Sequence, residues 1–343
     1  MESPRQYNPP MTIRVLLVGL GPIGAAVARQ LAGRKGLKIV GAVDVDPYKA
    51  GRDVGEVAEL GRPLRLKVTD NLVKTIRSTR PDVAVVCTSS SFAAVLPQFE
   101  QILKLKVPIV TTTEEVAYVA PKNRRLAKKL DDAARKAKVA VVGTGVNPGF
   151  TMDALPIALT AVCERVDTIA VQRVQDARIR RLPFQQKIGA GLTPAQFAKK
   201  VKDGSVRHVG FAESIQMIGD AMGWKVERVT ENIQPVIAEH GVEGELLAVD
   251  PGYVSGIIQD GVGYVDGKPR ITLRLEAYLG APESYDSVDI EGVPAIHSRI
   301  EGGVHGDIAT ASMAINSIPK VIDARPGLRT MRDLGLPSFF GGR

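Results

Sequence analysis

Short apolar segments alternate with amphipathic segments from about residue 12 to residue 149. Each apolar segment ends at a glycine, an aspartate or hydroxyl side chains, which is typical of a buried strand that finishes in a turn. The amphipathic segments repeat apolar residues at intervals of three and four, which favours helices packed on a sheet. This repeated strand–helix order predicts an α/β fold with a doubly wound parallel sheet. Strands are predicted at residues 13–18, 37–43, 82–88, 108–111 and 139–143, and helices at residues 25–31, 71–76, 92–105 and 121–137.

The pattern changes at about residue 150. Longer segments alternate apolar and polar residues there, which favours the strands of an open, mostly antiparallel sheet. Strands are predicted at residues 166–174, 227–238, 253–265 and 269–279, and helices at residues 153–163, 193–202, 212–222 and 307–318. The expected organisation is a flexible leader (1–11), a parallel-sheet domain (12–149), an α+β domain (150–302), and a C-terminal helix and tail that return to the first domain (303–343).

A glycine-rich turn joins the first predicted strand to the first predicted helix. In Gly19-Leu20-Gly21-Pro22-Ile23-Gly24, the first glycine permits a tight turn, the second lets the backbone approach a phosphate, and the third lets helix and strand pack closely. The N–H groups of the helix N-terminus attract an anion. Asp44 ends the second strand about 20 residues later, where a carboxylate binds the ribose hydroxyls of adenosine. A turn that merely uses glycine would not explain this acid, so the pattern predicts a Rossmann-type site for NAD or NADP.

Composition and charge exclude several classes of protein. The 343 residues suffice for about two domains, and 44% of them are hydrophobic. No apolar run approaches the ~20 residues that span a bilayer, and the two cysteines have no disulfide-framework or metal spacing, so we expect a cytoplasmic protein. The four histidines are far apart in sequence, so we expect no metal. Much of the net charge of +8 lies in residues 122–138, opposite an apolar helix face, which is typical of a solvated surface and not of a nucleic-acid site.

Two adjacent carboxylates follow the strand predicted at residues 108–111. Glu114 and Glu115 are expected at the carboxyl end of the sheet, where such folds bind ligands. A glutamate whose pKa is raised by burial there can exchange protons near neutral pH. Alternatively, both residues occupy the first turn of the next helix, whose dipole favours acids. Because neighbours point in different directions, Glu114 is our first catalytic candidate and Glu115 the alternative.

Other strand ends supply candidates for contact with the cofactor. The glycines of residues 143–150 let the backbone approach a flat ring, and Asn147 can bind the nicotinamide carboxamide or a substrate; an ordinary loop between domains would also account for them. Residues 88–91 offer hydroxyls and amides to the cofactor, or an N-cap to the next helix. The predicted cofactor-binding residues are Gly19, Gly21, Pro22, Ile23, Gly24, Asp44, Thr88, Ser89, Thr112, Asn147 and Pro148.

The α+β domain is expected to bind the substrate and to form a dimer. Polar residues 172–176 end a predicted strand, and Arg173 can pair with a substrate carboxylate, although an ordinary surface cluster has the same composition. His305 immediately precedes the last predicted helix, for which Asp307 is a plausible cap. The predicted substrate-binding residues are Phe150, Gln172, Arg173, Gln175 and His305.

Three motifs, at residues 18–24, 110–115 and 143–150, resemble the dihydrodipicolinate-reductase-like superfamily. Within it they are most similar to the branch of 2,4-diaminopentanoate dehydrogenases and native amine dehydrogenases, and residues 305–328 resemble that branch as well. The glycine motif is common to many dehydrogenases, whereas the other two are more specific. The resemblance implies a homodimer that uses NAD(P)H to interconvert a primary amine with a ketone and ammonia, with its catalytic glutamate at Glu114 or Glu115.

Two neighbouring activities match the residues less well. Homoserine dehydrogenases, which resemble this region, place a lysine at the position of Glu114. Dihydrodipicolinate reductases carry a paired-histidine motif, and this chain has no adjacent histidines. The sequence therefore argues against both activities.

The first hypothesis is an amine dehydrogenase acting on a 2,4-diaminopentanoate-like or simple aliphatic amine, with Glu114 deprotonating ammonium and stabilising a cationic iminium. One alternative is an NAD(P)H-dependent imine or carbonyl reductase that needs no ammonia. Another is a non-catalytic NAD(P)-binding regulator with residues 122–138 as its partner surface. Asp44 favours NAD because it repels a 2′-phosphate, whereas Lys49 and Arg52 lie close enough in sequence to accommodate NADP. Both cofactors are therefore expected to bind.

Overall fold

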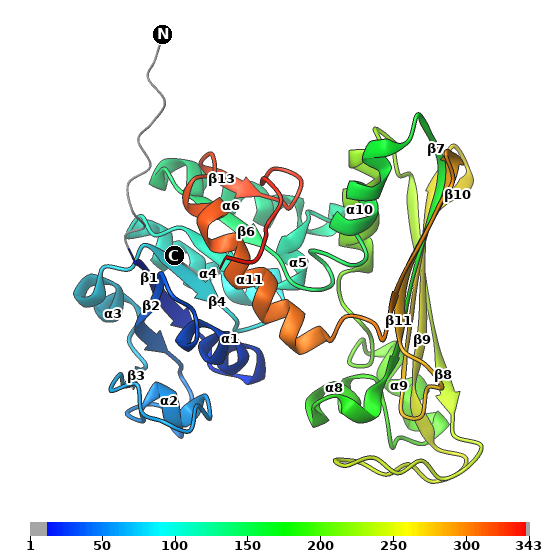
Figure 1. Cartoon of the computed structure of the whole chain (residues 1–343), viewed down its shortest axis with the longest axis horizontal. Coiled ribbons are helices and arrows are strands. Elements are labelled where there is room, and N and C mark those ends of the chain that lie inside the picture. Colours follow the sequence, from blue (N-terminus) through cyan, green and yellow to red (C-terminus); the bar gives the residue numbers. More distant parts are fainter. Residues whose placement is uncertain (1–11, 341–343) are drawn as a thin grey trace. The chain divides into compact units, whose positions relative to one another are not determined.

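A computed structural model describes residues 12–340, so the leader expected at residues 1–11 lies outside the described residues. These residues form two compact units (Figure 1). The first unit runs to Ala117 and resumes over Pro121–Gly145 and from Asp307, and the second comprises Tyr118–Ala120 and Val146–Gly306. Within residues 12–340, no helix is long and apolar enough to cross a membrane, and no group of histidine, cysteine or acidic side chains could hold a metal ion.

The described part of the first unit holds a parallel sheet of seven strands in the order β13-β6-β5-β4-β1-β2-β3. Every neighbouring pair is parallel, and the four residues of β4 and of β6 are all buried, as expected for strands covered on both faces. The strands are β1 (Ile13–Val18), β2 (Leu37–Val43), β3 (Val68–Thr69), β4 (Val83–Val86), β5 (Ile109–Thr111), β6 (Ala140–Gly143) and β13 (Gly327–Arg329). The sequence thus predicted the parallel sheet correctly, whereas the short edge strands β3 and β13 were missed.

Amphipathic helices cover this sheet and begin or end at residues with suitable side chains or backbone. Asn71 accepts a hydrogen bond from the backbone N–H of Lys74 at the start of α3, and α6 ends at Lys138 in the left-handed conformation. In α6 the buried residues are Ala127, Leu130, Ala134 and Ala137, so its basic residues face solvent. The helices are α1 (Pro22–Ala32), α2 (Val54–Val57), α3 (Leu72–Thr79), α4 (Phe92–Lys104), α5 (Glu114–Ala117), η1 (Pro121–Asn123), α6 (Arg124–Ala137) and α11 (Gly306–Ile322).

The second unit is built on a mixed sheet whose six strands follow the order β12-β11-β7-β10-β9-β8 in the described chain. Only β7 and β10 pair in parallel there, and the other neighbours are antiparallel, as the sequence predicted. The strands are β7 (Arg165–Asp176), β8 (Arg228–Ile237), β9 (Val254–Val265), β10 (Lys268–Tyr278), β11 (Tyr285–Val293) and β12 (Ile296–Glu301). The strands β11 and β12 were not predicted, because β12 alternates half-buried and exposed residues without a fully buried one.

The helices of the second unit lie on one side of this sheet (Figure 1). Phe211 and Ile215 of α10 pack on β9 where Gly261 and Gly263 leave room, since a Cβ at either glycine would lie within 2.8 Å of one of these side chains. Buried residues of β7, β9 and β10 complete one apolar core with α10. The helices are α7 (Ala154–Leu159), η2 (Thr160–Val162), η3 (Ala177–Ile179), α8 (Leu182–Lys187), α9 (Pro194–Lys202) and α10 (Phe211–Ala221).

Candidate active site

The glycine turn between β1 and α1 adopts a geometry that only glycine allows at two of its three positions. Gly19 has a φ of +86°, and a Cβ there would lie 2.8 Å from the carbonyl oxygen of Cys87. A Cβ at Gly24 would lie 1.9 Å from the carbonyl oxygen of Gly19. A Cβ at Gly21 would meet no atom within 4 Å. Gly19 and Gly24 therefore permit the turn itself, while Gly21 borders open space that a ligand can enter.

The N-terminus of α1 suits an anion. Gly21 is the N-cap and supplies no side-chain hydrogen bond, and Pro22 has no N–H to offer. The backbone N–H of Ala25 bonds to the carbonyl oxygen of Gly21. The N–H groups of Ile23 and Gly24 lie in the first turn, where helices commonly bind the phosphates of dinucleotides.

A cavity of about 660 Å³ opens at the carboxyl ends of β1, β2 and β4. Small-molecule sites typically measure about 300–1,000 Å³, and in doubly wound sheets they lie at this end of the strands. Its position beside Gly21 and the N-terminus of α1 fits the pyrophosphate and adenosine of a dinucleotide. The lining residues are Val18, Gly19, Gly21, Val43, Asp44, Val45, Lys49, Asp70, Asn71, Leu72, Val73, Cys87, Thr88, Ser89, Ala94, Gln98 and Gln101.

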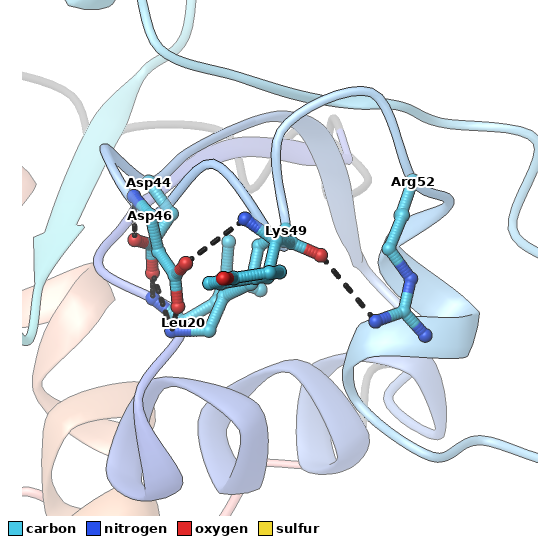
Figure 2. Close-up of polar contacts among 6 residues, drawn as sticks. Leu20, Asp44, Asp46, Lys49 and Arg52 are labelled. Carbon is cyan, nitrogen blue, oxygen red and sulfur yellow. Dashed lines mark hydrogen bonds and ion pairs between the residues drawn. The ribbon is translucent and has the colours of Figure 1, made fainter.

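Asp44 ties the end of β2 to the glycine turn. Its Oδ2 accepts a hydrogen bond of 2.7 Å from the backbone N–H of Leu20, and its Oδ1 accepts one of 2.9 Å from that of Asp46 (Figure 2). The ammonium of Lys49 lies 3.3 Å from Oδ2. The side chain remains 10% exposed at the cavity, so a fixed carboxylate is presented where ribose hydroxyls are expected.

Thr88 and Ser89 line the same cavity after β4, and Thr112 lies at the neighbouring strand end. The Thr88 hydroxyl donates to Gln98 Oε1 at 2.8 Å, and Ser89 Oγ accepts from the N–H of Ser91. Thr112 donates its N–H to the carbonyl oxygen of Val86. Ser91 is the N-cap residue of α4, but its side chain makes no capping hydrogen bond.

The two glutamates after β5 have different surroundings. Both lie in the first turn of α5, as the alternative interpretation predicted. Glu115 Oε2 accepts a hydrogen bond of 2.9 Å from the backbone N–H of Phe92 and so caps α4, and its Oε1 lies 2.8 Å from the ammonium of Lys122. Glu115 therefore joins α4 to α5. Glu114 is half-buried and lies directly before Glu115 at the start of α5, after the carboxyl end of β5.

In the second unit, the segment after Gly145 is fixed by a buried carboxylate. Asp153 accepts hydrogen bonds from the N–H groups of Gly149 (2.8 Å) and Ala154 (2.5 Å) and from the hydroxyl of Ser214 (2.8 Å). Burial raises the pKa of Asp153, and these hydrogen bonds work against that rise. Ser214 lies 61 residues further along the chain, so local spacing did not indicate this arrangement.

Asp153 thereby fixes the segment that carries Asn147 and Pro148, which were predicted to bind the cofactor, and Phe150, which was predicted to bind the substrate. Asn147 precedes Pro148 in a cis peptide, and its Nδ2 contacts the Met152 sulfur at 2.8 Å. Among the described residues, nothing donates a hydrogen bond to the buried Oδ1 of Asn147. Phe150 is half-buried beside it. A buried carbonyl oxygen of this kind suits a ligand that can donate a hydrogen bond.

The predicted substrate residues of β7 divide between the two faces of its sheet. Arg173 and Gln175 lie on the buried face, whereas Gln172 points to the opposite face and bonds to Glu276. Arg173 pairs with Asp286 at 2.5 Å and donates to the carbonyl oxygen of Val304, which also accepts from Gln175. The carboxylate partner of Arg173 thus comes from the protein itself.

This cluster also holds the residue before His305. Asp286 Oδ2 accepts a 2.7 Å hydrogen bond from the backbone N–H of Val304, while Arg173 and Gln175 bind its carbonyl oxygen. His305, which is half-buried, therefore follows a residue whose backbone is fixed on both sides. Asp286 was not among the predicted residues, because it lies in β11, a strand that the pattern did not reveal.

His208 lies near three positively charged side chains, one of which is Arg173. Burial and the positive charges of Lys187, Arg173 and Arg180 lower the pKa of His208 to about 3. Its ring is therefore neutral at physiological pH. The backbone of His208 is held by Gln259, whose side chain donates to its carbonyl oxygen and accepts from its N–H.

Two family models match the chain. The 2,4-diaminopentanoate dehydrogenase C-terminal domain matches residues 150–342, and the dihydrodipicolinate reductase N-terminus matches residues 13–143. The chain belongs to the 2,4-diaminopentanoate dehydrogenase family. It is 33% identical to the 2,4-diaminopentanoate dehydrogenase of Acetoanaerobium sticklandii, over 96% of this chain and 95% of that protein. The resemblance inferred from the three motifs is thereby confirmed.

Amine dehydrogenases are also similar to the chain. That of Streptomyces virginiae is 23% identical over 96% of this chain and 98% of its own length. The structure of an amine dehydrogenase from Mycobacterium smegmatis superposes with a TM-score of 0.86 at 24% identity, over 96% of this chain and 98% of that one, which shows a shared fold. The chain is accordingly an oxidoreductase of the amine dehydrogenase class that uses a nicotinamide cofactor.

Proposed function

We propose that the protein catalyses the reversible oxidative deamination of a primary amine to a ketone and ammonia, with NAD or NADP. The substrate class is a 2,4-diaminopentanoate-like or simple aliphatic amine. The observation that carries this proposal is the cavity at the carboxyl ends of β1, β2 and β4, because Glu114 follows the carboxyl end of β5, the strand next to β4. The similarity to 2,4-diaminopentanoate dehydrogenase supports the reaction type.

The proposed chemistry begins with the substrate bound as an ammonium ion. Glu114 takes the proton of the bound ammonium group and releases it to solvent, so that Glu114 is ionised again when the nitrogen lone pair forms a C=N bond and hydride leaves the carbon. When bound, the nicotinamide cofactor accepts that hydride. Water then adds to the iminium carbon, and the C–N bond breaks to give the ketone and ammonia. In reverse, Glu114 deprotonates ammonium so that ammonia can attack the ketone.

A carboxylate suits this sequence because the reacting carbon and nitrogen carry positive charge as the iminium forms. The negative charge of Glu114 stabilises that cation more than it stabilises the neutral amine, which is the requirement for lowering the barrier. A lysine at this position would repel the cation. Asn147, Pro148 and Phe150 remain the proposed ligands from the second unit, with Asp153 as the residue that positions them.

Turnover with and without ammonium tests the proposal. Purified protein is given NADH or NADPH with 2-amino-4-oxopentanoate or simple aliphatic ketones at alkaline pH. The unaltered protein should oxidise the cofactor only with ammonium present. Glu114→Gln should lower the rate about a hundredfold to ten-thousandfold, the contribution of a general base, and should still bind the cofactor.

Glu115→Gln is the matched control. Its amide oxygen can still accept the N–H of Phe92, and the ion pair lost with Lys122 is worth at most about 1 kcal/mol, so the rate should stay within about threefold. Turnover that does not need ammonium would contradict the proposal and favour an imine or carbonyl reductase. Cofactor binding without turnover of any ketone would favour a regulator.

We also propose a homodimer formed through the sheet face of the second unit that is opposite its helices (Figure 1). Half-buried residues of β9 on this face, Ile258, Val262 and Tyr264, border Arg274 and its partners Asp260 and Glu276. Apolar area and charges of both signs on one face suit a two-fold contact with its own copy. Sedimentation should give the mass of two chains for the unaltered protein and the mass of one chain for Val262→Arg. A single-chain mass for the unaltered protein would contradict the proposed dimer.

The proposed compartment is the cytoplasm, which cell fractionation tests.

A further inference from the structure

An ion-paired lysine lies in the part of the cavity where the adenosine ribose is expected. The ammonium of Lys49 is 3.3 Å from Asp44 Oδ2 and 3.2 Å from Asp46 Oδ2 (Figure 2). Lys49 and Asp44 both line the cavity. One cation thus stands between two carboxylates at the position that distinguishes NAD from NADP, whose 2′-phosphate carries about two negative charges.

The three side chains differ in how firmly they are held. Asp44 is fixed by the N–H groups of Leu20 and Asp46, and Asp46 Oδ1 accepts the N–H of Tyr48. Among residues 12–340, the ammonium of Lys49 makes only the two ion pairs, and its long side chain is 26% exposed. Burial lowers the pKa of Lys49, but the hydrogen bonds and charges of Asp46 and Asp44 more than offset this and leave it raised. Lys49 is therefore charged, and it is the member of the group that can turn.

The other basic residue of this segment is committed elsewhere. The guanidinium of Arg52 contacts Glu56 Oε1 at 2.6 Å and the carbonyl oxygen of Tyr48 at 3.4 Å. Arg52 does not line the cavity, and Figure 2 shows it apart from the two aspartates. The sequence offered both Lys49 and Arg52 as partners of a 2′-phosphate. In the structure, Lys49 lines the cavity and Arg52 does not.

We propose that Lys49 lets the protein bind NADP as well as NAD by exchanging Asp44 for the 2′-phosphate. With NAD, Lys49 stays on the two aspartates, and the fixed carboxylate of Asp44 accepts the ribose hydroxyls. With NADP, the ammonium turns to the phosphate and offsets its repulsion by Asp44. This inference rests on the proposed function only in assuming that the cavity holds the adenosine half of a nicotinamide cofactor.

Direct binding of the reduced cofactors tests the inference without any amine or ketone. The affinities of NADH and NADPH are measured by titrating their fluorescence with unaltered protein and with Lys49→Met. Because one charged contact is lost, Lys49→Met should weaken the binding of NADPH roughly tenfold or more. The affinity for NADH should change less than about threefold. Asp46→Asn, which releases Lys49 from one carboxylate, should strengthen NADPH binding several-fold, and this gain should shrink at high salt.

Arg52→Met is the matched control. Arg52 lies three residues after Lys49 in sequence, and its positively charged side chain does not line the cavity. The substitution should leave both affinities within about twofold. Equal weakening of NADH and NADPH by Lys49→Met would overturn the inference, as would selective loss of NADPH in Arg52→Met. If the unaltered protein binds neither cofactor, the dinucleotide site itself fails, which is a different result from a site that binds both without depending on Lys49.

Discussion

The glycine turn of the first unit and the Arg173 cluster of the second unit organise polar groups in opposite ways. Around Gly21, backbone N–H groups and the Asp44 carboxylate face a cavity and remain available to a ligand. Around Arg173, the charges are buried and pair with one another, so that Asp286 neutralises the guanidinium and both bind Val304. The first region is built to receive a charged ligand, and the second to hold a segment of its own chain. Charged residues at a strand end therefore indicate a binding site where they line a cavity, and a structural role where they are buried against one another.

The largest expected effect comes from breaking the buried ion pair. Asp286→Asn keeps an oxygen for the N–H of Val304 but leaves the buried Arg173 guanidinium without its counter-charge, which should lower the free energy of unfolding by about 3–5 kcal/mol. Trp224, the only tryptophan, lies in the second unit, so its fluorescence during urea unfolding reports on that unit.

Asp289→Asn, in the same strand, is the control for this change. Asp289 pairs with His297 on exposed surface, so its loss should cost less than about 1 kcal/mol. Equal losses for Asp286→Asn and Asp289→Asn would show that the Arg173 cluster does not fix the second unit.

A smaller effect should separate the glycines of the first region. Gly24→Ala places a Cβ 1.9 Å from the carbonyl oxygen of Gly19 and should destabilise the first unit by about 3 kcal/mol. Gly21→Ala meets no atom, so stability should change by less than about 1 kcal/mol, while its methyl group, in the space meant for phosphate, should weaken NADH binding about tenfold.

Thermal unfolding and cofactor titration of the two glycine variants check these values. The informative outcome is the contrast, with stability lost in Gly24→Ala and affinity lost in Gly21→Ala. A Gly21→Ala protein that binds NADH as tightly as the unaltered chain would contradict the assignment of this turn to the pyrophosphate.

Much of the first unit could be predicted because its signals are local. The pattern placed β1, β2, β4, β5 and β6 and the longer helices close to their observed ranges. Strand β13 was missed because three residues carry no periodicity, and it forms only by pairing with β6. In the second unit, β12 was missed because none of its residues is fully buried, whereas β11 was missed although the buried Val288 and Ile290 alternate there with polar residues.

The candidate site shows the same limit at the level of single residues. The sequence named Gly21 and Asp44, and the structure places them at one cavity, because strand, turn and second-strand end are adjacent in a parallel sheet. The roles of Glu115 and Asp153 depend on Phe92 and Ser214, 23 and 61 residues away in sequence, and no spacing rule connects such pairs.

By itself, the sequence determined the parallel-sheet unit, its glycine turn and the acid at the end of the second strand, since these depend on local spacing and hydrophobic period. The resemblance of three motifs to a known family indicated the family of the protein. Tertiary structure alone decided which of two adjacent glutamates caps a helix, that Arg173 is neutralised from within, and that Lys49 rather than Arg52 reaches the cavity. The physical reason is that the partners of these side chains come from parts of the chain that are distant in sequence, so local spacing and hydrophobic period do not reveal them.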